Sequence, residues 1–314
     1  MAHAADGAPE RLGGAPRSSW LPWTVATIVA LLMSATGSEA EAASPATSIY
    51  QGFLHPRPVV IRGYTGNAME PFVTPDGKYM LFNNSNSAEH TTLRYATRLD
   101  DTTFLYGGKV SGANDSHALT AVPTVTADGT LYFTSTRSYP QTLSTVYEAQ
   151  FRDGEATDVA LVAGLAAPRP GIVNFDVDVA SDGHSLYVSQ GAFSGGSSPD
   201  AASIVLYTGR AEGFTRDPSS DRLMKDVNDP SALNYAADIS PDGLVLFFTR
   251  SVAGAPPQVY RAERSDPSRP FGNVQLVGAA TGYVEAPSLS GDGRLLYYHH
   301  KTGNHFMIFV VSRG

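Results

Sequence analysis

The sequence predicts an all-β fold: a five-bladed β-propeller of four-stranded blades, closed by a strand from the N-terminal part of the chain that completes the last blade. Three observations predict it. The composition, with 30 Gly, 21 Pro, 14 Phe and 15 Tyr in 314 residues, favours turns and strands over long helices. A unit centred on Asp-Gly occurs five times. The last copy lacks a strand, which an isolated strand near the N-terminus can supply.

Residues 1–42 are typical of a secretory signal peptide. Arg11 and Arg17 precede an apolar run of sixteen residues from Trp20 to Ala35, and Ala40-Glu41-Ala42 provides an Ala-x-Ala cleavage site. The run is shorter than the roughly 20 residues that cross a bilayer. We therefore expect cleavage near Ala42 and no membrane span afterwards, with an uncleaved N-terminal anchor as the alternative. Both readings place the folded part outside the cytoplasm, in the periplasm or secreted.

The rest of the chain divides into a flexible linker, residues 43–54, and the propeller, residues 55–314. The chain has no Cys, which excludes disulfides, thiolate metal sites and a Cys nucleophile. Its formal net charge is −8 and it contains no basic run, so we expect no nucleic-acid partner. We expect the protein to be a monomer.

Five segments share one pattern: an aliphatic residue three positions before Asp-Gly, a tight turn, and an apolar run after the Gly. Their turn residues are Asp76, Asp128, Asp182, Asp242 and Asp292. Asp accepts hydrogen bonds from the backbone of the turn, and Gly supplies the positive φ that the turn requires. Each unit therefore predicts a β-hairpin whose second strand is apolar almost throughout.

A third strand is expected after each hairpin. The five predicted third strands are Leu93–Thr97, Val146–Gln150, Ile204–Thr208, Gln258–Ala262 and Phe306–Val310. A fourth strand is clearest at Val274–Val277. Four strands in about 50 residues, repeated without intervening helices, are typical of propeller blades.

The two ends of the chain predict how the ring closes. The fifth copy reaches Gly314 after its third strand, while residues 58–62 (PVVIR) form an isolated strand ahead of the first copy. Thr65-Gly66 lies as far before Asp76 as Thr281-Gly282 lies before Asp292. We therefore expect residues 58–62, centred on Val59–Ile61, to be the fourth strand of the last blade, which removes two open sheet edges.

The turns Thr74-Pro75-Asp76-Gly77 and Ser240-Pro241-Asp242-Gly243, with Val146-Tyr147 and Val259-Tyr260 in third strands, resemble the WD40-like, TolB-type repeat known as PD40. The resemblance covers residues 55–314. Only two of the five turns carry Pro, and TolB has six blades and a separate α/β domain that this sequence lacks. The resemblance implies an exported repeat protein that binds other proteins or cell-envelope components, and it transfers no catalytic residue.

We expect the Asp residues of the turns to be structural and the opposite end of the axis to be the functional face. First strands begin there with Glu70, Asp176 and Glu285, and Asp178 and Asp238 lie deeper. Further polar residues end the second strands or follow them, namely Asn84, Arg137, Gln190, Arg250 and His300. A ring of acids with Arg and His around it is typical of a polar ligand site. The alternative is a polar channel that needs no ligand.

The sequence therefore favours a non-catalytic propeller that binds a protein or a cell-envelope glycan at this face. The alternative is a carbohydrate hydrolase that uses Glu70, Asp176 and Glu285, because glycosidases place two carboxyl groups about 5–9 Å apart. These acids lie six, six and seven residues before their turns, which leaves open whether all three face the axis. A third option is a structural repeat protein with a plugged channel.

Metal sites have weaker support in the sequence. Asp176-x-Asp178 resembles the start of a calcium loop, but the third acid, Asp182, is displaced by two residues. His299-His300 and His305 offer no clear third ligand, and adjacent residues of a strand point to opposite faces. We expect no cofactor, with calcium at Asp176 and Asp178 as the alternative. The common hydrolase, metalloprotease and nucleotide-binding motifs are absent from the sequence.

Overall fold

The computed structural model describes residues 52–87, 90–195, 198–210 and 213–314. The predicted signal peptide, and residues 43–51 of the predicted linker, lie outside these residues. Within them, no helix is long and apolar enough to cross a membrane. The only helices among these residues are single turns, α1 (Tyr139–Thr142) and α2 (Ser220–Leu223).

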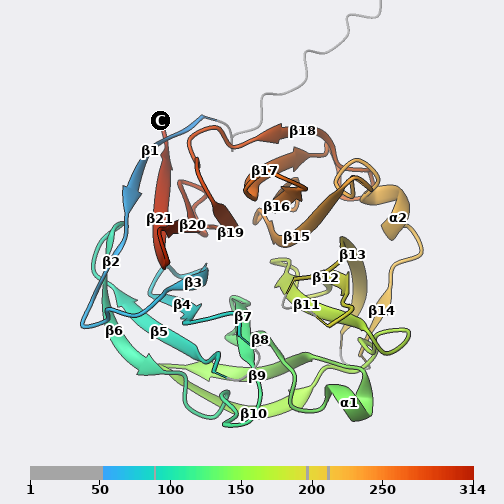
Figure 1. Cartoon of the computed structure of the whole chain (residues 1–314), viewed down its shortest axis with the longest axis horizontal. Coiled ribbons are helices and arrows are strands. Elements are labelled where there is room, and N and C mark those ends of the chain that lie inside the picture. Colours follow the sequence, from blue (N-terminus) through green and yellow to red (C-terminus); the bar gives the residue numbers. More distant parts are fainter. Residues whose placement is uncertain (1–51, 88–89, 196–197, 211–212) are drawn as a thin grey trace, which may run out of the picture. The chain divides into compact units, whose positions relative to one another are not determined.

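The prediction of a five-bladed β-propeller is confirmed, because five sheets surround a common axis (Figure 1). Blade 1 contains β3 (Met69–Val73), β4 (Tyr79–Asn83), β5 (Leu93–Arg98), β6 (Thr103–Lys109) and the added strand β2 (Val60–Arg62). Blade 2 contains β7 (Thr120–Val125), β8 (Thr130–Ser135), β9 (Val146–Arg152) and β10 (Glu155–Leu161). Blade 3 contains β11 (Ile172–Val179), β12 (Ser185–Ala192), β13 (Ala201–Arg210) and β14 (Gly213–Arg216). Blade 4 contains β15 (Ala232–Ile239), β16 (Val245–Val252), β17 (Gln258–Glu263) and β18 (Gly272–Leu276). Blade 5 contains β19 (Val284–Leu289), β20 (Leu295–Thr302), β21 (His305–Arg313) and β1 (Phe53–Pro58).

The first strand of each repeat lies next to the axis and the later strands lie progressively farther out (Figure 1). Each Asp-Gly pair forms the predicted tight turn between the first two strands. In blade 1, the N–H of Gly77 donates to the carbonyl of Thr74 at 2.7 Å, and Asp76 accepts the N–H of Lys78 at 3.0 Å. The Gly residue of every such turn has positive φ, between 65° and 90°. All five turns therefore lie at one end of the axis and have a structural role.

The ring is closed by an N-terminal strand, but not by the segment that the sequence predicts. β1 pairs antiparallel with β21, whereas β2 pairs parallel with β6 in blade 1. Val59 lies between them, and its N–H donates to the carbonyl of Ile308 at 2.8 Å. The prediction of closure is confirmed, and the expectation that residues 58–62 supply the closing strand is wrong. β1 is an edge strand, so its two Pro residues are tolerated at the unpaired edge.

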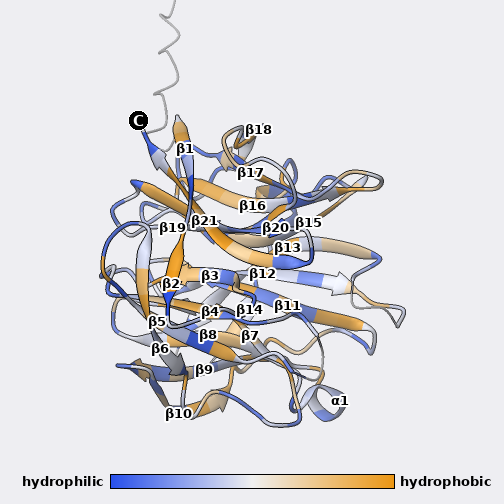
Figure 2. Ribbon diagram, turned by 60° about the vertical axis from the view of Figure 1, so that its left-hand side comes forward, coloured by the Kyte–Doolittle hydropathy of each residue, from blue (hydrophilic) through white to orange (hydrophobic). Residues whose placement is uncertain are grey.

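Five clusters of buried apolar side chains fill the five seams between neighbouring blades. Figure 2 shows hydrophobic residues concentrated along the strands and hydrophilic residues in the turns. Phe53 of the closing strand belongs to the seam between blades 4 and 5, where its ring packs edge-on against Phe247 with centroids 5.8 Å apart. Burying one such side chain contributes about 1.5–3 kcal/mol. Closure is therefore stabilised by packing as well as by strand pairing.

Candidate functional site

A β-bulge interrupts the innermost strand of every blade, on the side away from the Asp-Gly turns. In β3, for example, the bulge inserts one extra residue between Met69 and Phe72. In four blades a non-glycine residue at the bulge has φ between 49° and 54°: Glu70, Val122, Ala236 and Ala286. A bulge re-aims the side chains beside it. The residues six and seven positions before each Asp can therefore both reach the axial region.

The four residues with positive φ tie neighbouring blades together. Each donates its backbone N–H to a side chain at the end of the second strand of the preceding blade, at 3.0 to 3.3 Å. The acceptors are Asn83, Ser189, Thr249 and His299. Blade 3 departs from this rule: Asp176 occupies the equivalent position without a positive φ. Ser135, the corresponding residue of blade 2, bonds to Arg137 instead.

A second ring of bonds lies closer to the Asp-Gly turns. Asp178 accepts the Thr124 hydroxyl and the Ile239 N–H, both at 2.8 Å, and Asp238 accepts the Leu289 N–H at 2.9 Å. Burial raises the pKa of Asp178 to about 7, and burial together with the Asp178 charge raises the pKa of Asp238. These two acids therefore join blades.

A cavity of about 740 Å³ opens at the bulge end of the axis, and Glu70, Asp176 and Glu285 all line it. Towards the turns it meets a channel of only about 30 Å³, lined by Asp178 and Asp238 among others, which has room for a water molecule or two. The structure thus brings together the three acids that the sequence singles out. The bulge explains why offsets of six and seven residues both lead to the cavity.

Asp176 is the cavity acid whose side chain has no hydrogen-bond partner among the described residues. It is 5% exposed and lines the cavity, yet no described residue donates a hydrogen bond to its carboxyl group. Burial raises its pKa well above the usual range, and the charges of Glu70 and Asp178 add to this. A buried carboxyl group normally has hydrogen-bond partners. The Asp176 carboxyl group therefore borders the cavity without a described protein group that fixes it.

Glu285 has the opposite environment. Its Oε2 lies 3.0 Å from His299 Nε2, and its Oε1 accepts the hydroxyl of Tyr235. Burial alone would raise its pKa, but hydrogen bonds from His299, Tyr235 and Tyr283 outweigh burial and lower it. The Glu285 carboxyl group is therefore ionised at neutral pH and fixed in orientation.

His299 links Glu285 to Glu70. Its Nδ1 accepts the N–H of Glu70 at 3.1 Å, so in the neutral ring the proton lies on Nε2, which faces Glu285. Burial lowers the pKa of His299, but the hydrogen bond to Glu285 and the nearby acids raise it overall. The Glu70 side chain accepts Asn86 Nδ2 at 3.0 Å, and burial raises the pKa of Glu70.

Aromatic side chains complete the cavity wall. Phe175 packs edge-on against Phe193 with centroids 5.7 Å apart, and it also contacts Tyr235 at 6.0 Å. On another side Tyr283 and Phe306 pack edge-on at 6.1 Å. All five side chains line the cavity. It therefore combines a few acids with flat apolar walls, as ligand pockets commonly do.

The other five predicted site residues lie outside the cavity lining. Asn84 accepts the N–H of Thr92, and Gln190 donates to Asn174 Oδ1 at 2.9 Å. Arg250 donates to Asn234 Oδ1 at 2.8 Å and covers the Tyr260 ring. Arg137 lies over the Tyr147 ring, and His300 bonds to Thr302 and packs against Phe309.

Four of these five residues occupy the position immediately after the interblade acceptors. Side chains alternate along a strand, so residues 84, 190, 250 and 300 point away from the faces that residues 83, 189, 249 and 299 use. Sequence reasoning also missed Phe175 and Tyr235. Both lie seven residues before their Asp, the column that holds Glu285 in blade 5. Comparing that column across the repeats could have identified them.

The structure adds no further ligand to the predicted calcium site at Asp176 and Asp178 among the described residues. Asp178 is occupied by Thr124 and Ile239. Among the described residues there is no group of three or more His, Asp or Glu arranged to hold a metal ion. The binding of calcium by Asp176 and Asp178 remains a prediction.

Comparison with solved structures shows the same fold in several proteins. A thermostable family-43 glycoside hydrolase has a TM-score of 0.52 and 12% sequence identity, over 82% of this chain and 97% of that one. Zg3597, a family-117 glycoside hydrolase from the marine bacterium Zobellia galactanivorans, also has a TM-score of 0.52 and 12% identity, over 84% and 92%. At such identities the likeness concerns the fold.

TolB from Acinetobacter baumannii is also similar, with a TM-score of 0.45, 16% identity and coverage of 79% of this chain. The match spans 55% of that TolB structure, so this chain corresponds to about half of it. No family model matches the chain. No curated protein sequence matches it either.

Proposed function

We propose that the axial cavity binds a carbohydrate of the cell envelope through Asp176, Glu70 and Glu285. The observation that carries this proposal is the buried Asp176 carboxyl group, which lines the cavity without a hydrogen-bond partner in the described chain. A carboxyl group accepts hydrogen bonds in either protonation state and also donates one when it is protonated, which suits a ligand rich in hydroxyl groups. The aromatic wall offers flat apolar surfaces to the sugar ring.

A thermal-shift screen of glycans and divalent cations tests this proposal. The wild-type protein is compared with the triple variant Glu70→Gln, Asp176→Asn, Glu285→Gln, and with Asp266→Asn, which removes an exposed acid outside the cavity. We expect at least one glycan to raise the Tm of the wild type and of Asp266→Asn but not of the triple variant. A shift that persists in the triple variant, or no response to any glycan, contradicts it. No response would favour a protein partner at this face.

Hydrolysis of the bound carbohydrate is the second candidate. It is favoured by the opposite pKa shifts of Asp176, whose pKa is raised, and Glu285, whose pKa is lowered. Glycosidases pair a protonated acid with an ionised carboxylate. Asp176 would protonate the leaving oxygen as the glycosidic bond breaks, and Glu285 would stabilise the positive charge that develops on the sugar. A water molecule would then add to the anomeric carbon and give its proton back to the Asp176 carboxylate. Release of reducing ends from a bound glycan, reduced at least 100-fold by Asp176→Asn, would support this reaction.

We also propose that the chain is exported and that its blades are PD40-type repeats. The apolar run with an Ala-x-Ala site and the two Pro-Asp-Gly turns support these proposals. N-terminal sequencing of the protein from the periplasmic and secreted fractions tests export. A mature chain that begins near Ala43 is expected, and a chain that retains residue 1 in the cytoplasm would contradict it.

A further inference from the structure

A second cavity, of about 410 Å³, lies at the end of the axis that carries the Asp-Gly turns, where the closing strand meets the last blade. It is lined by His55 and Arg57 of β1, Arg294 next to the blade 5 turn, Ser312 and Arg313 of β21, and Asp101 of blade 1. Three segments that are distant in sequence therefore meet here. The axial cavity shares no residue with it.

The charge of this cavity is opposite to that of the molecule. Three Arg, one His and a single Asp line the cavity in a chain whose net charge is −8, and of the three Arg, Arg313 has an interaction of its own. Asp101 is already paired with Arg98 at 2.6 Å. The Arg57 side chain forms no ion pair or hydrogen bond with any described residue. Arg294 lies 3.8 Å from Asp292, and both side chains are more than half exposed, so that pair is weak. The cavity therefore has an excess of positive charge.

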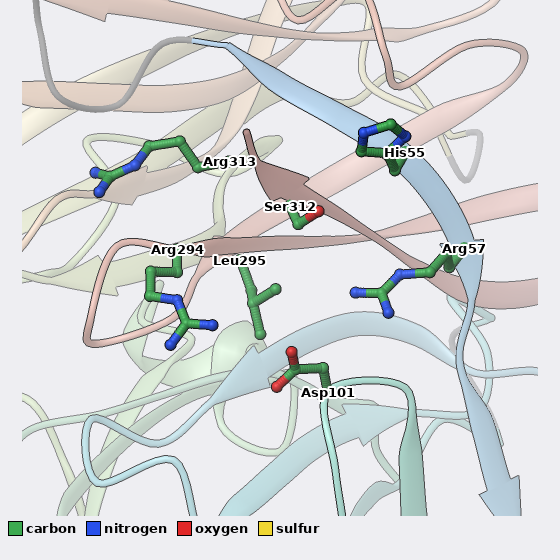
Figure 3. Close-up of a pocket in the computed structure, with 7 residues that line it drawn as sticks. All are labelled: His55, Arg57, Asp101, Arg294, Leu295, Ser312 and Arg313. Atoms are coloured by element: carbon green, nitrogen blue, oxygen red, sulfur yellow. The ribbon is translucent and has the colours of Figure 1, made fainter.

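The backbone of the closing strand directs the basic side chains to this place. A bulge inserts one residue between Leu54 and Arg57, and His55 has a φ of 56°. A non-glycine residue in this conformation is unfavourable on its own. Figure 3 shows Arg57 and Arg294 extending from opposite sides, with the Leu295 side chain between them in this view, Ser312 on one side and Asp101 on the other. The two guanidinium groups thus border one cavity, and Ser312 belongs to its lining.

We propose that this cavity binds a phosphate-class oxyanion, with Arg57 and Arg294 as its principal ligands. Guanidinium groups match the geometry of such oxygens through paired hydrogen bonds, and Ser312 adds a neutral donor. The Asp101 carboxylate accepts a hydrogen bond from a hydroxyl group beside the anion, so a phosphate monoester that carries hydroxyl groups fits better than inorganic phosphate. The bound anion bridges the closing strand to blade 5 and stabilises the closed ring.

Isothermal titration with inorganic phosphate, glycerol 3-phosphate and uncharged glycerol tests the site. We expect saturable binding of both phosphates, tighter for glycerol 3-phosphate, and no binding of glycerol. Arg57→Gln and Arg294→Gln should each weaken binding at least 10-fold. The control variant Arg269→Gln, which removes another exposed Arg outside the cavity, should bind as the wild type does. The wild-type Tm should rise with phosphate, and that rise should be lost in Arg57→Gln.

Binding that is equal in the wild type and in both Arg57→Gln and Arg294→Gln would overturn the site, as would the absence of binding by either phosphate. Tighter binding of inorganic phosphate than of glycerol 3-phosphate would overturn the role given to Asp101. Each variant is checked for an unchanged circular dichroism spectrum. Because Arg57 and Arg294 come from different segments, local damage to one does not remove the test.

Discussion

Asp176 and Asp178 lie two residues apart on β11, both point towards the axis, and both are buried, yet they have different partners. Asp178 accepts hydrogen bonds from Thr124 in blade 2 and Ile239 in blade 4. No described residue donates a hydrogen bond to Asp176, which lines the cavity. Burial and acidity alone therefore do not distinguish a structural acid from a ligand-binding acid. The use of the side chain distinguishes them, because the Asp178 carboxylate accepts the interblade bonds, whereas the position of Asp176 bonds between blades only in the other four blades and only through its backbone N–H.

Of the substitutions that test this comparison, removal of the Asp178 side chain should lower the free energy of unfolding the most. Asp178→Ala leaves the Ile239 N–H and the Thr124 hydroxyl buried without their acceptor, at a cost of about 1–3 kcal/mol for each group. We expect the free energy of unfolding in urea to fall by about 3 kcal/mol. Asp178→Asn keeps an acceptor and should lose about 1 kcal/mol. If Asp178→Ala lowers the free energy of unfolding by less than about 0.5 kcal/mol, which is typical of surface substitutions, these hydrogen bonds are not structural.

The pH dependence of stability separates these acids from surface acids. Burial raises the pKa values of Glu70, Asp176, Asp178 and Asp238. Between pH 5 and about 7 the folded protein therefore holds protons that the unfolded chain has released. Stability should fall as pH rises through this range, by up to about 1.4 kcal/mol per pH unit for each group that titrates.

Urea unfolding at several pH values measures this slope. Asp178→Asn and Asp176→Asn should each make the slope shallower, because each removes one titrating acid. The exposed Asp266, whose pKa is lowered by hydrogen bonds from Ser268, provides the control variant Asp266→Asn, which should leave the slope unchanged. A wild-type stability that is flat or rises between pH 5 and 7 would refute the assignment.

Removal of a single interblade hydrogen bond should lower the free energy of unfolding the least. Thr249→Val removes the acceptor of the Ala286 N–H, which is 3.0 Å from Thr249 Oγ1, without changing side-chain volume greatly. We expect a loss of about 1 kcal/mol in the free energy of unfolding. Ser135→Ala provides the comparison, since Ser135 bonds within its own blade to Arg137, and it should lose less. Equal losses would show that the interblade bond has no special role.

The sequence was sufficient for the blade number and for the hairpins, because Asp-Gly with a buried strand on each side is a local signal. It was insufficient for the closing strand. Residues 53–58 (FLHPRP) contain two Pro and no β-branched residue, and their first two residues fall in the predicted linker 43–54, whereas the β-branched Val59–Ile61 are typical of a strand. An edge strand needs only one bonded side, and that side is provided by β21, which is distant in sequence.

The acids of the candidate site could be predicted from the sequence, but the backbone geometry and the contacts between blades that complete the site could not. The acids Glu70, Asp176 and Glu285 could be found by their residue type and repeat position, and the structure places all three in one cavity. The bulge that brings them together is a backbone feature that the residue types do not specify. His299, which bonds to Glu285, lies opposite it in the blade 5 hairpin, whereas Tyr235 reaches Glu285 from blade 4, a contact between blades that no local pattern specifies.

The most direct test of the central claim, that Asp176 serves a ligand and not the fold, is a paired measurement on Asp176→Asn. Its free energy of unfolding and its affinity for a glycan that binds the wild type are determined in the same buffer. We predict a free energy of unfolding that is unchanged or higher, since a buried acid without a partner is removed, and an affinity at least 10-fold weaker. A protein that is destabilised yet binds the glycan as the wild type does would contradict the claim.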